Sequence, residues 1–346
     1  MNIVIENDIK EIICENLPWE KFKGKTILIA GANGFIPSYI VRTFIELSKK
    51  YADIKVLALV RNEEKAKSKF KDILNNKNFK LIIQDISKPF TIDEHIDYII
   101  HAASQASPKF YGVDPVGTLK ANTLGTAYLL DLALKNNVEK FLFISSGEVY
   151  GTVNEETSEL KEDNTGNIDI TNVRSCYGES KRMGETMCVS YAHQYGLKTN
   201  MVRLSHTYGP GIPLDDGRVF ADFVSDVIHN RNIVLNSDGS AKRSFCYITD
   251  MIKAMFYVLF YGENMNAYNI ASDSEISILE LAKMLTCLYP EKNLKVEFNR
   301  DVFKDGYLKS PSSRLFFNTD KLKSLGWKET IDIKTGFKRM IESYSL

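Results

Sequence analysis

Short apolar runs recur along the first two thirds of the chain, and each is followed by a polar turn and a longer segment. Runs of this length without alternation are typical of strands that are buried on both faces of a parallel sheet. Because strands and helices alternate, we predict an α/β fold built on a doubly wound parallel sheet. The runs predicted as strands are residues 26–30, 54–60, 79–83, 97–100, 141–144 and 199–204.

Helical periodicity marks several of the other segments. Residues 1–23 carry isoleucines and a leucine at helical spacing, so we predict an amphipathic helix that ends near Pro18. We expect this helix to pack on the core fold or on a second subunit. Further helices are predicted over residues 62–75, 116–136, 174–195, 250–261 and 278–289.

Composition narrows the class of protein. The chain has 346 residues, with 44 Lys and Arg against 44 Asp and Glu, so no global field favours nucleic acid or an anionic membrane. No apolar run approaches the ~20 residues that a membrane helix needs, and the acidic N-terminal segment is not a signal peptide. The five cysteines lack CxxC spacing, so we expect reduced thiols, no metal site and a cytoplasmic location.

A glycine-rich turn joins the first predicted strand to a helix. The turn Gly31-Ala-Asn-Gly34 lets the backbone approach a pyrophosphate, which the free N–H groups of the helix attract. This context predicts a dinucleotide site of the Rossmann type, although Pro37 stands where a third glycine is usual. The residues that we expect to contact the cofactor in this turn are Gly31, Asn33, Gly34, Phe35 and Ile36.

The ends of the next strands extend the expected cofactor site. Arg61 follows the second strand, where an acid would bind the ribose of NAD and an arginine could face the 2′-phosphate of NADP. NAD is therefore expected and NADP is not excluded. It is equally consistent with the sequence that Arg61 faces solvent and contacts no cofactor. Asp85 is placed to meet the adenine. Further expected cofactor contacts are Ile86, Ala102, Ala103, Ser104 and Asn122.

The segment from 141 to 181 carries the candidate chemistry. Ser146 ends a predicted strand, and Tyr177 and Lys181 share one face of a helix at spacing i, i+4. A free phenol has a pKa of about 10, and a nearby ammonium lowers it by favouring the phenolate. Such a trio can take a proton from a sugar hydroxyl while hydride leaves the same carbon. The Tyr–Lys pair alone could arise by chance on a solvated helix, but the glycine turn upstream favours the catalytic reading.

The pattern of predicted secondary structure changes after residue 204, where short strands, turns and two amphipathic helices follow. We therefore expect residues 1–204 to form the N-terminal helix and the dinucleotide-binding domain. Residues 205–346 are expected to form mainly a smaller C-terminal substrate-binding lobe. The boundary is soft, because segments can cross between the two parts.

With GANGFIP, HAAS, SSGEVYG and YGESK in this order, the chain resembles the extended short-chain dehydrogenase/reductases of the NAD-dependent epimerase/dehydratase family. The stretches RSCYGESKRMGETMCVSYA, DDGRVFADFV and DGSAKRSFCYITD are most similar to UDP-glucuronate decarboxylases. The resemblance implies NAD, a UDP-linked sugar, a nucleotide-sugar-binding C-terminal lobe and a homodimer formed through the helices at 116–136 and 174–195. It also implies oxidation at C4, loss of CO2 and return of the hydride.

The resemblance implies a role for several side chains. Ser146, Tyr177 and Lys181 would form the redox triad, and the triad tyrosine and lysine would also contact the cofactor. Glu148 would act beside the sugar C5, and Arg243 would contact the substrate carboxylate. Further implied substrate contacts are Ser107, Tyr111, Arg174, His206, and, for the diphosphate, Arg218 and Arg314. A histidine packed at the junction of the two lobes is an equally good interpretation of His206.

The chain departs from the family pattern at two positions. Gly147 stands where decarboxylases usually carry serine and 4,6-dehydratases aspartate, and His206 stands where asparagine is usual. Loss of the aspartate counts against ordinary 4,6-dehydration, whereas Glu148 and water could still serve decarboxylation. A 4-epimerase is the first alternative, because it does not need that side chain. A 4,6-dehydratase or 4-reductase comes next, and a non-catalytic cofactor-binding protein last.

Overall fold

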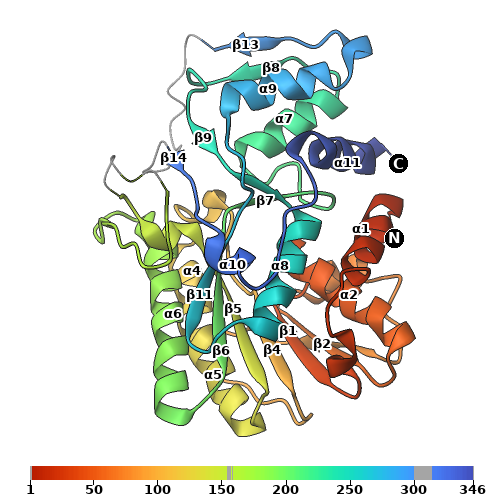
Figure 1. Cartoon of the computed structure of the whole chain (residues 1–346), viewed down its shortest axis with the longest axis vertical. Coiled ribbons are helices and arrows are strands. Elements are labelled where there is room, and N and C mark those ends of the chain that lie inside the picture. Colours follow the sequence, from red (N-terminus) through yellow and green to blue (C-terminus); the bar gives the residue numbers. More distant parts are fainter. Residues whose placement is uncertain (1, 154–156, 158, 300–313, 346) are drawn as a thin grey trace.

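A parallel sheet forms the centre of the molecule (Figure 1). The computed structural model describes residues 2–153, 157, 159–299 and 314–345. Within these ranges seven parallel strands are ordered β11-β6-β5-β4-β1-β2-β3. The strands are β1 (Thr26–Ala30), β2 (Lys55–Val60), β3 (Phe79–Ile83), β4 (Tyr98–His101), β5 (Lys140–Ser146), β6 (Thr199–Leu204) and β11 (Asn266–Ile270).

Helices cover both faces of this sheet, because the strands are apolar on both sides. In β1, Ile27 and Ile29 pack into the core under α2 (Phe35–Lys50) and α8 (Ile248–Tyr261), while Leu28 and Ala30 pack into the core on the opposite face. That second core lies under α5 (Leu124–Asn136) and α6 (Ser175–Tyr195). The predicted doubly wound parallel sheet is confirmed.

The helix predicted over 116–136 is two helices, α4 (Pro115–Asn122) and α5. The break falls at Thr123, whose backbone leaves ideal helical geometry with φ −108° and ψ −69°. The Thr123 hydroxyl donates to the Leu119 carbonyl at 2.7 Å, a back-bond that bends helices. The helix predicted over 62–75 is also shorter, since α3 covers Glu63–Lys69 and is capped by Asn62.

The N-terminal helix α1 (Ile3–Ile13) ends five residues before Pro18, near which its end was predicted, and a 3-10 turn η1 (Trp19–Phe22) follows. Its apolar face is buried through Ile9 and Ile12. The helix packs on α2, on α8 and on α11 (Ile333–Ser345) of this chain.

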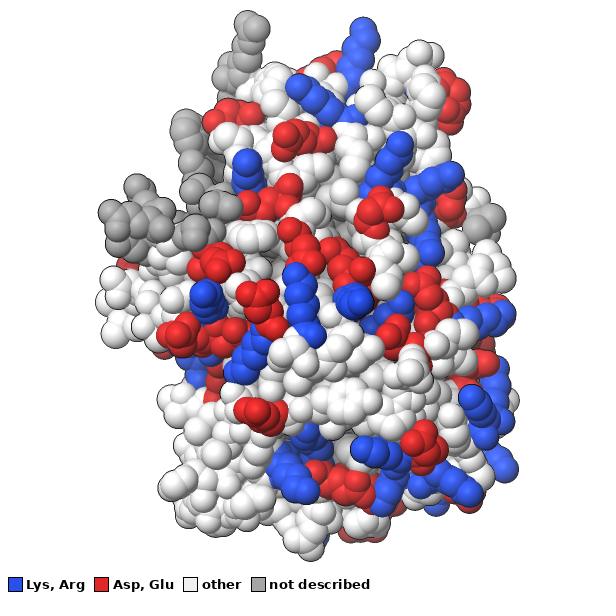
Figure 2. All heavy atoms as spheres, viewed as in Figure 1, with Lys and Arg blue, Asp and Glu red and all other residues white. Residues whose placement is uncertain are grey.

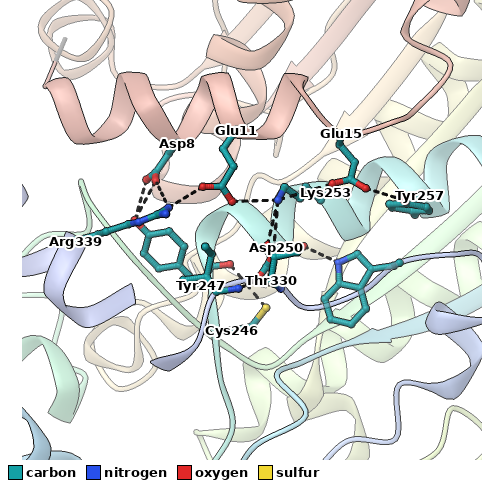
Figure 3. A network of polar contacts seen from close by, with 12 residues as sticks. Asp8, Glu11, Glu15, Cys246, Tyr247, Asp250, Lys253, Tyr257, Thr330 and Arg339 are labelled. Carbon is teal, nitrogen blue, oxygen red and sulfur yellow. Dashed lines mark hydrogen bonds and ion pairs between the residues drawn. The ribbon is translucent and has the colours of Figure 1, made fainter. Parts of the chain in front are cut away.

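A network of polar contacts fixes α1 in place (Figure 3). Asp8 accepts hydrogen bonds from the hydroxyls of Tyr39 at 3.1 Å and Tyr247 at 2.9 Å. Glu11 contacts Arg339 at 2.8 Å and Lys253 at 3.1 Å. The first helix is therefore held to the sheet layer and to the C-terminal helix at once.

A smaller lobe lies over the carboxyl ends of the strands, at the top of Figure 1. Strand β11 and helix α8 come from the second half of the chain but belong to the large sheet layer, so the chain crosses between the two parts. A division at residue 204 therefore remains a proposal. Helix α10 (Asp320–Lys323) packs on β11 and α8 of the sheet layer. The other elements of the second half are β7 (His206–Tyr208), α7 (Val219–Ile228), β8 (Ile233–Leu235), β9 (Lys242–Arg243), β10 (Phe245–Tyr247), β12 (Ile276–Ser277), α9 (Ile278–Cys287), η4 (Pro290–Lys292), β13 (Val296–Phe298), β14 (Arg314–Leu315) and α11.

The surface carries charges of both signs. Figure 2 shows lysine and arginine side chains interspersed with aspartate and glutamate side chains over one face of the molecule. Among the described residues, every helix is too short or too polar to span a bilayer.

Candidate active site

The side chains of Ser146, Tyr177 and Lys181 meet where β5 ends and α6 begins. The Ser146 hydroxyl lies close enough to the Tyr177 side chain to favour its phenolate, and its oxygen accepts from the Glu148 backbone nitrogen at 3.2 Å. The Lys181 Nζ lies 5.8 Å from the centroid of the Tyr177 ring and donates to the Ile144 carbonyl oxygen at 2.7 Å. Tyr177 and Lys181 are both buried. The structure thus brings the predicted trio together at the carboxyl edge of the sheet.

Burial shifts the two titratable members of this trio in opposite directions. Burial raises the pKa of Tyr177 to about 12, although the Ser146 hydroxyl and the charge of Arg218 act against the rise. Burial lowers the pKa of Lys181 to about 7, and the charge of Glu185 acts against this fall. The expected lowering of the Tyr177 pKa is thus not what this structure shows, because removing the phenolate from water outweighs the favourable contacts.

A second aromatic ring covers the trio. Tyr111 stacks on Tyr177 with the ring centroids 5.0 Å apart and an interplanar angle of 16°. The Arg174 guanidinium lies 5.5 Å from the Tyr111 ring centroid, and its Nη2 pairs with Glu148 Oε1 at 3.0 Å. The carboxylate predicted to act at the sugar C5 therefore belongs to the same cluster as the trio. Glu148 itself lies in the 3-10 turn η3 (Gly147–Tyr150) directly after β5.

Cationic side chains approach from the smaller lobe. Burial lowers the pKa of His206 to about 3, and the charges of Arg243 and Arg218 act in the same direction. His206 is therefore a neutral imidazole at physiological pH, close to two guanidinium groups. The Arg218 Nε pairs with Asp216 Oδ2 at 3.0 Å. The backbone of Arg314 lies beside β9 in strand β14, and its side chain is outside the described part of the structure.

Ser107, an expected substrate contact, joins two loops. Its hydroxyl donates to the carbonyl oxygen of Asp216 at 2.6 Å, and Ser107 is 7% exposed. The short turn η2 (Pro108–Phe110) follows it directly. Ser107 thus connects the loop after β4 to the loop that carries Arg218, and its hydroxyl is occupied by this contact.

The glycine turn forms a cradle at the start of α2. Gly31 has φ +76°, and a Cβ at this position would lie 2.5 Å from the Cα of Ala103. A side chain at residue 31 would therefore be strained and would collide with the backbone after β4. Gly34 is the N-cap of α2, so the free N–H groups of that helix begin here. Asn33, Phe35, Ile36 and Ala102 are partly exposed around this cradle.

Two buried polar atoms beside the cradle fit a dinucleotide. The Ser104 hydroxyl oxygen and Asn122 Oδ1 have no hydrogen-bond partner within the described ranges. The amide nitrogen of Asn122 is already used, since it donates to Ser180 Oγ at 2.9 Å. Buried polar atoms of this kind normally have a partner, so these residues suit a polar cofactor.

The residues expected at the adenosine end lie farther along the sheet. Asp85 Oδ1 accepts from the backbone nitrogen and the hydroxyl of Ser87, at 3.0 Å and 2.8 Å. The pKa of Asp85 is lowered, because these hydrogen bonds and the charge of Arg61 outweigh the opposing effect of burial. Arg61 is exposed, and Ile86 is buried against the position of Gly125.

Phe317 is a residue of this region that the sequence did not indicate. A Cβ added to Gly147 would lie 2.3 Å from Cζ of the Phe317 ring. The glycine that departs from the family pattern thus makes room for an aromatic ring from a distant segment. Gly147 itself was the only signal in the sequence. In the described ranges, no group of three or more His, Cys, Asp or Glu side chains is placed to hold a metal ion.

A model of the NAD dependent epimerase/dehydratase family matches residues 27–271. UDP-glucuronic acid decarboxylase 5 of Arabidopsis thaliana is 31% identical over 320 residues, covering 92% of this chain and 89% of that protein. UDP-glucuronic acid decarboxylase 1 of Danio rerio is 30% identical over 324 residues, covering 93% and 73%. A solved structure of UDP-glucuronic acid 4-epimerase from Bacillus cereus superposes with a TM-score of 0.77 at 22% identity, covering 92% and 99%, which shows the shared fold.

Proposed function

Because this chain belongs to the NAD dependent epimerase/dehydratase family, we propose that it is an NAD-dependent enzyme that modifies a nucleotide sugar through a transient 4-keto sugar. The proposed reaction is decarboxylation of UDP-glucuronate to UDP-xylose. The observation that carries the proposal is the buried convergence of Ser146, Tyr177 and Lys181, with the Glu148–Arg174 ion pair in the same cluster. The similarity to UDP-glucuronic acid decarboxylases over nine tenths of the chain supports this substrate.

The cradle at the start of α2 is where we place the cofactor. Gly31 and Gly34 would lie against its pyrophosphate, and Ser104 and Asn122 would supply polar contacts. Bound NAD supplies a hydride acceptor for C4 of the sugar and later returns the hydride. We propose NAD rather than NADP, although Arg61 is exposed at the end of β2.

The side chains of the trio divide the proton transfer between them. Tyr177 accepts the proton of the C4 hydroxyl, and Ser146 hydrogen-bonds the same oxygen. When it is protonated, Lys181 would favour the phenolate of Tyr177 electrostatically, against the burial that otherwise disfavours this charge. Glu148, which Arg174 holds in place, moves a proton at C5, and Arg243 binds the substrate carboxylate.

The test is product analysis with UDP-glucuronate, UDP-glucose and UDP-xylose offered separately, with NAD or NADP present. We expect CO2 and UDP-xylose from UDP-glucuronate. Arg243→Ala should abolish CO2 release, because the substrate carboxylate would lose the cation that we propose binds it. The neighbouring exposed Lys242→Ala serves as the matched control and should retain it. If no CO2 forms from UDP-glucuronate with either cofactor, the proposed reaction is wrong.

A 4-epimerase is the second candidate, and Gly147 is the observation that favours it. Epimerisation needs the trio, the cofactor and room for the keto sugar to turn, and no side chain at residue 147. Glu148→Gln separates the two reactions, because it should stop decarboxylation and leave simple epimerisation largely intact. Interconversion of C4 epimers without CO2 release would favour the epimerase.

We also propose a homodimer that forms through α4, α5 and α6, the helices that cover the predicted segments 116–136 and 174–195. Apolar side chains are exposed on these helices, including Val116, Leu119 and Met183. Wild-type protein should sediment as a dimer at micromolar concentration, and Leu119→Glu combined with Met183→Glu should give a monomer. Val234→Glu, at an exposed apolar position on the smaller lobe, should leave the dimer intact. A monomeric wild type would exclude this interface.

A cytoplasmic location completes the proposal. All five cysteines are free thiols, and Cys14 and Cys287 are exposed. A reducing compartment keeps such thiols reduced, which supports the cytoplasm.

A further inference from the structure

The ring of Phe317 occupies the space that a side chain at residue 147 would need. A Cβ on Gly147 would lie 2.3 Å from Cζ and 2.7 Å from Cε1 of this ring. The same Cβ would be 3.5 Å from the carbonyl oxygen of Leu204, which is an ordinary contact. The obstacle at residue 147 is therefore the aromatic ring and not the backbone of the sheet.

The surrounding structure holds this ring in place. Phe317 is 3% exposed and packs edge-to-face on Tyr150, with the ring centroids 5.8 Å apart. Its backbone bridges to Leu160, whose carbonyl oxygen accepts from the nitrogen of Asn318 at 2.9 Å. Val149 and Ala271 complete the apolar cluster around it. A ring that is fixed on several sides cannot easily turn away from residue 147.

The location of Gly147 gives the ring a place in the proposed reaction. Gly147 lies between Ser146, which we place at the C4 oxygen, and Glu148, which we place at C5. We propose that Phe317, seated on Gly147, forms an apolar wall beside C5 of the sugar and is a specificity-determining residue that favours loss of CO2. This inference rests on the proposed decarboxylation.

The effect of an apolar wall on the rate of decarboxylation follows from the movement of negative charge during the step. The bond between C5 and the carboxylate carbon breaks, its electron pair passes to the oxygen at C4, and neutral CO2 leaves. A proton then adds at C5. An aromatic ring offers the carboxylate no hydrogen bond. The negative charge concentrated on the carboxylate before the step is therefore disfavoured relative to the same charge delocalised over C5 and the C4 oxygen after it. Arg243 is proposed to bind the carboxylate for catalysis, but a further polar side chain or water in place of the ring would stabilise the carboxylate more than the delocalised charge that follows, and would slow the step.

The position of the Phe317 ring against Gly147 is tested by a double-mutant cycle in which Tm is measured. Gly147→Ser alone should lower Tm by about 2–4 °C, because the new side chain collides with Phe317. In a Phe317→Leu background, whose side chain ends before the clashing atoms, the same serine should lower Tm by less than half as much. Equal effects of the serine in the two backgrounds would show that the ring does not occupy this position.

The chemical role is tested with two unbranched replacements of similar size, Phe317→Met and Phe317→Gln. Oxidation is followed as NADH formation in single turnover, and CO2 release is measured separately. Glutamine should slow CO2 release about tenfold relative to methionine, with the oxidation step and UDP affinity equal in both. Equal CO2 release from the two variants would overturn the apolar role. Absence of CO2 from the wild type would instead overturn the proposed decarboxylation, while the Tm cycle still decides where the ring lies.

Discussion

At the scale of single residues, the candidate site keeps a phenol and an ammonium away from water. Burial raises the pKa of Tyr177 to about 12 and lowers that of Lys181 to about 7, so both groups favour their neutral forms. Strong shifts of this kind at the carboxyl edge of an α/β sheet are typical of catalytic groups. The hydroxyl of Ser146 is the polar contact that favours the phenolate most.

Replacement of Tyr177 tests this assignment. Tyr177→Phe keeps the ring that stacks on Tyr111 but removes the proton-transferring hydroxyl. We expect turnover to fall by about 10²–10⁴-fold, with Tm close to that of the wild type. Tyr191→Phe is the control, because this tyrosine lies on the same helix with its hydroxyl bonded to Asp131. Turnover near the wild-type value in folded Tyr177→Phe would remove the tyrosine from the mechanism.

At the scale of elements, α1 depends on charges contributed by two other helices. Glu11 of α1 pairs with Lys253 of α8 and with Arg339 of α11, and the Lys253 side chain is only 5% exposed. A buried ammonium that loses a partner is costly, since little water can replace the carboxylate. Glu6 lies on the same helix and pairs with Lys10 at the exposed surface.

These two glutamates give a matched comparison. Glu11→Ala should lower the free energy of unfolding by about 1–3 kcal/mol, because two cations lose a hydrogen-bonded partner. Glu6→Ala should change it by less than about 0.5 kcal/mol, since exposed pairs contribute little. Urea denaturation of both variants measures the difference. Equal effects would mean that the network in Figure 3 does not stabilise the position of α1.

At the scale of the whole molecule, Asp8 joins three distant parts of the chain. It contacts Tyr39 of α2, Tyr247 of β10 and Arg339 of α11, and it is fully buried. Burial raises its pKa from 3.8 to about 6, although the tyrosine hydroxyls and Arg339 act against the rise. Folding therefore favours the protonated carboxyl, and the stability that it contributes below pH 3.8 is lost as the pH rises through 6.

Asp8→Asn should remove this pH dependence. The free energy of unfolding of the variant minus that of the wild type should rise between pH 4 and pH 7. Each pKa unit corresponds to about 1.4 kcal/mol, so the change from 3.8 to about 6 gives a full rise of about 3 kcal/mol, most of it within this pH range. Asp53→Asn is the control, because Asp53 is exposed and has the left-handed backbone that asparagine also adopts. A difference that stays flat for Asp8→Asn would contradict the raised pKa.

The sequence by itself determined six strands of the described seven-stranded sheet and most of the trio, but it did not predict β11 (Asn266–Ile270). The strands 26–30, 79–83 and 199–204 have the predicted bounds, and residues 26–30 are a run buried on both faces of the sheet. Tyr177 and Lys181 share a face because helical spacing is a local property. The glycine turn was predictable for the same reason, since its backbone conformation is local.

Only the tertiary structure determined which side chains from distant segments pack against these locally predicted features and bury them. In the sequence, Gly147 shows only that a side chain usual at this position is missing. The fold shows that the Phe317 ring fills the space that such a side chain would need. The stacking of Tyr111 on Tyr177 and the burial that raises the Tyr177 pKa also come from separate segments. Periodicity describes which face of an element is apolar, but it does not specify which residue of another element packs there. Desolvation depends on all the atoms around a group, so neither pKa nor packing could be derived from local sequence.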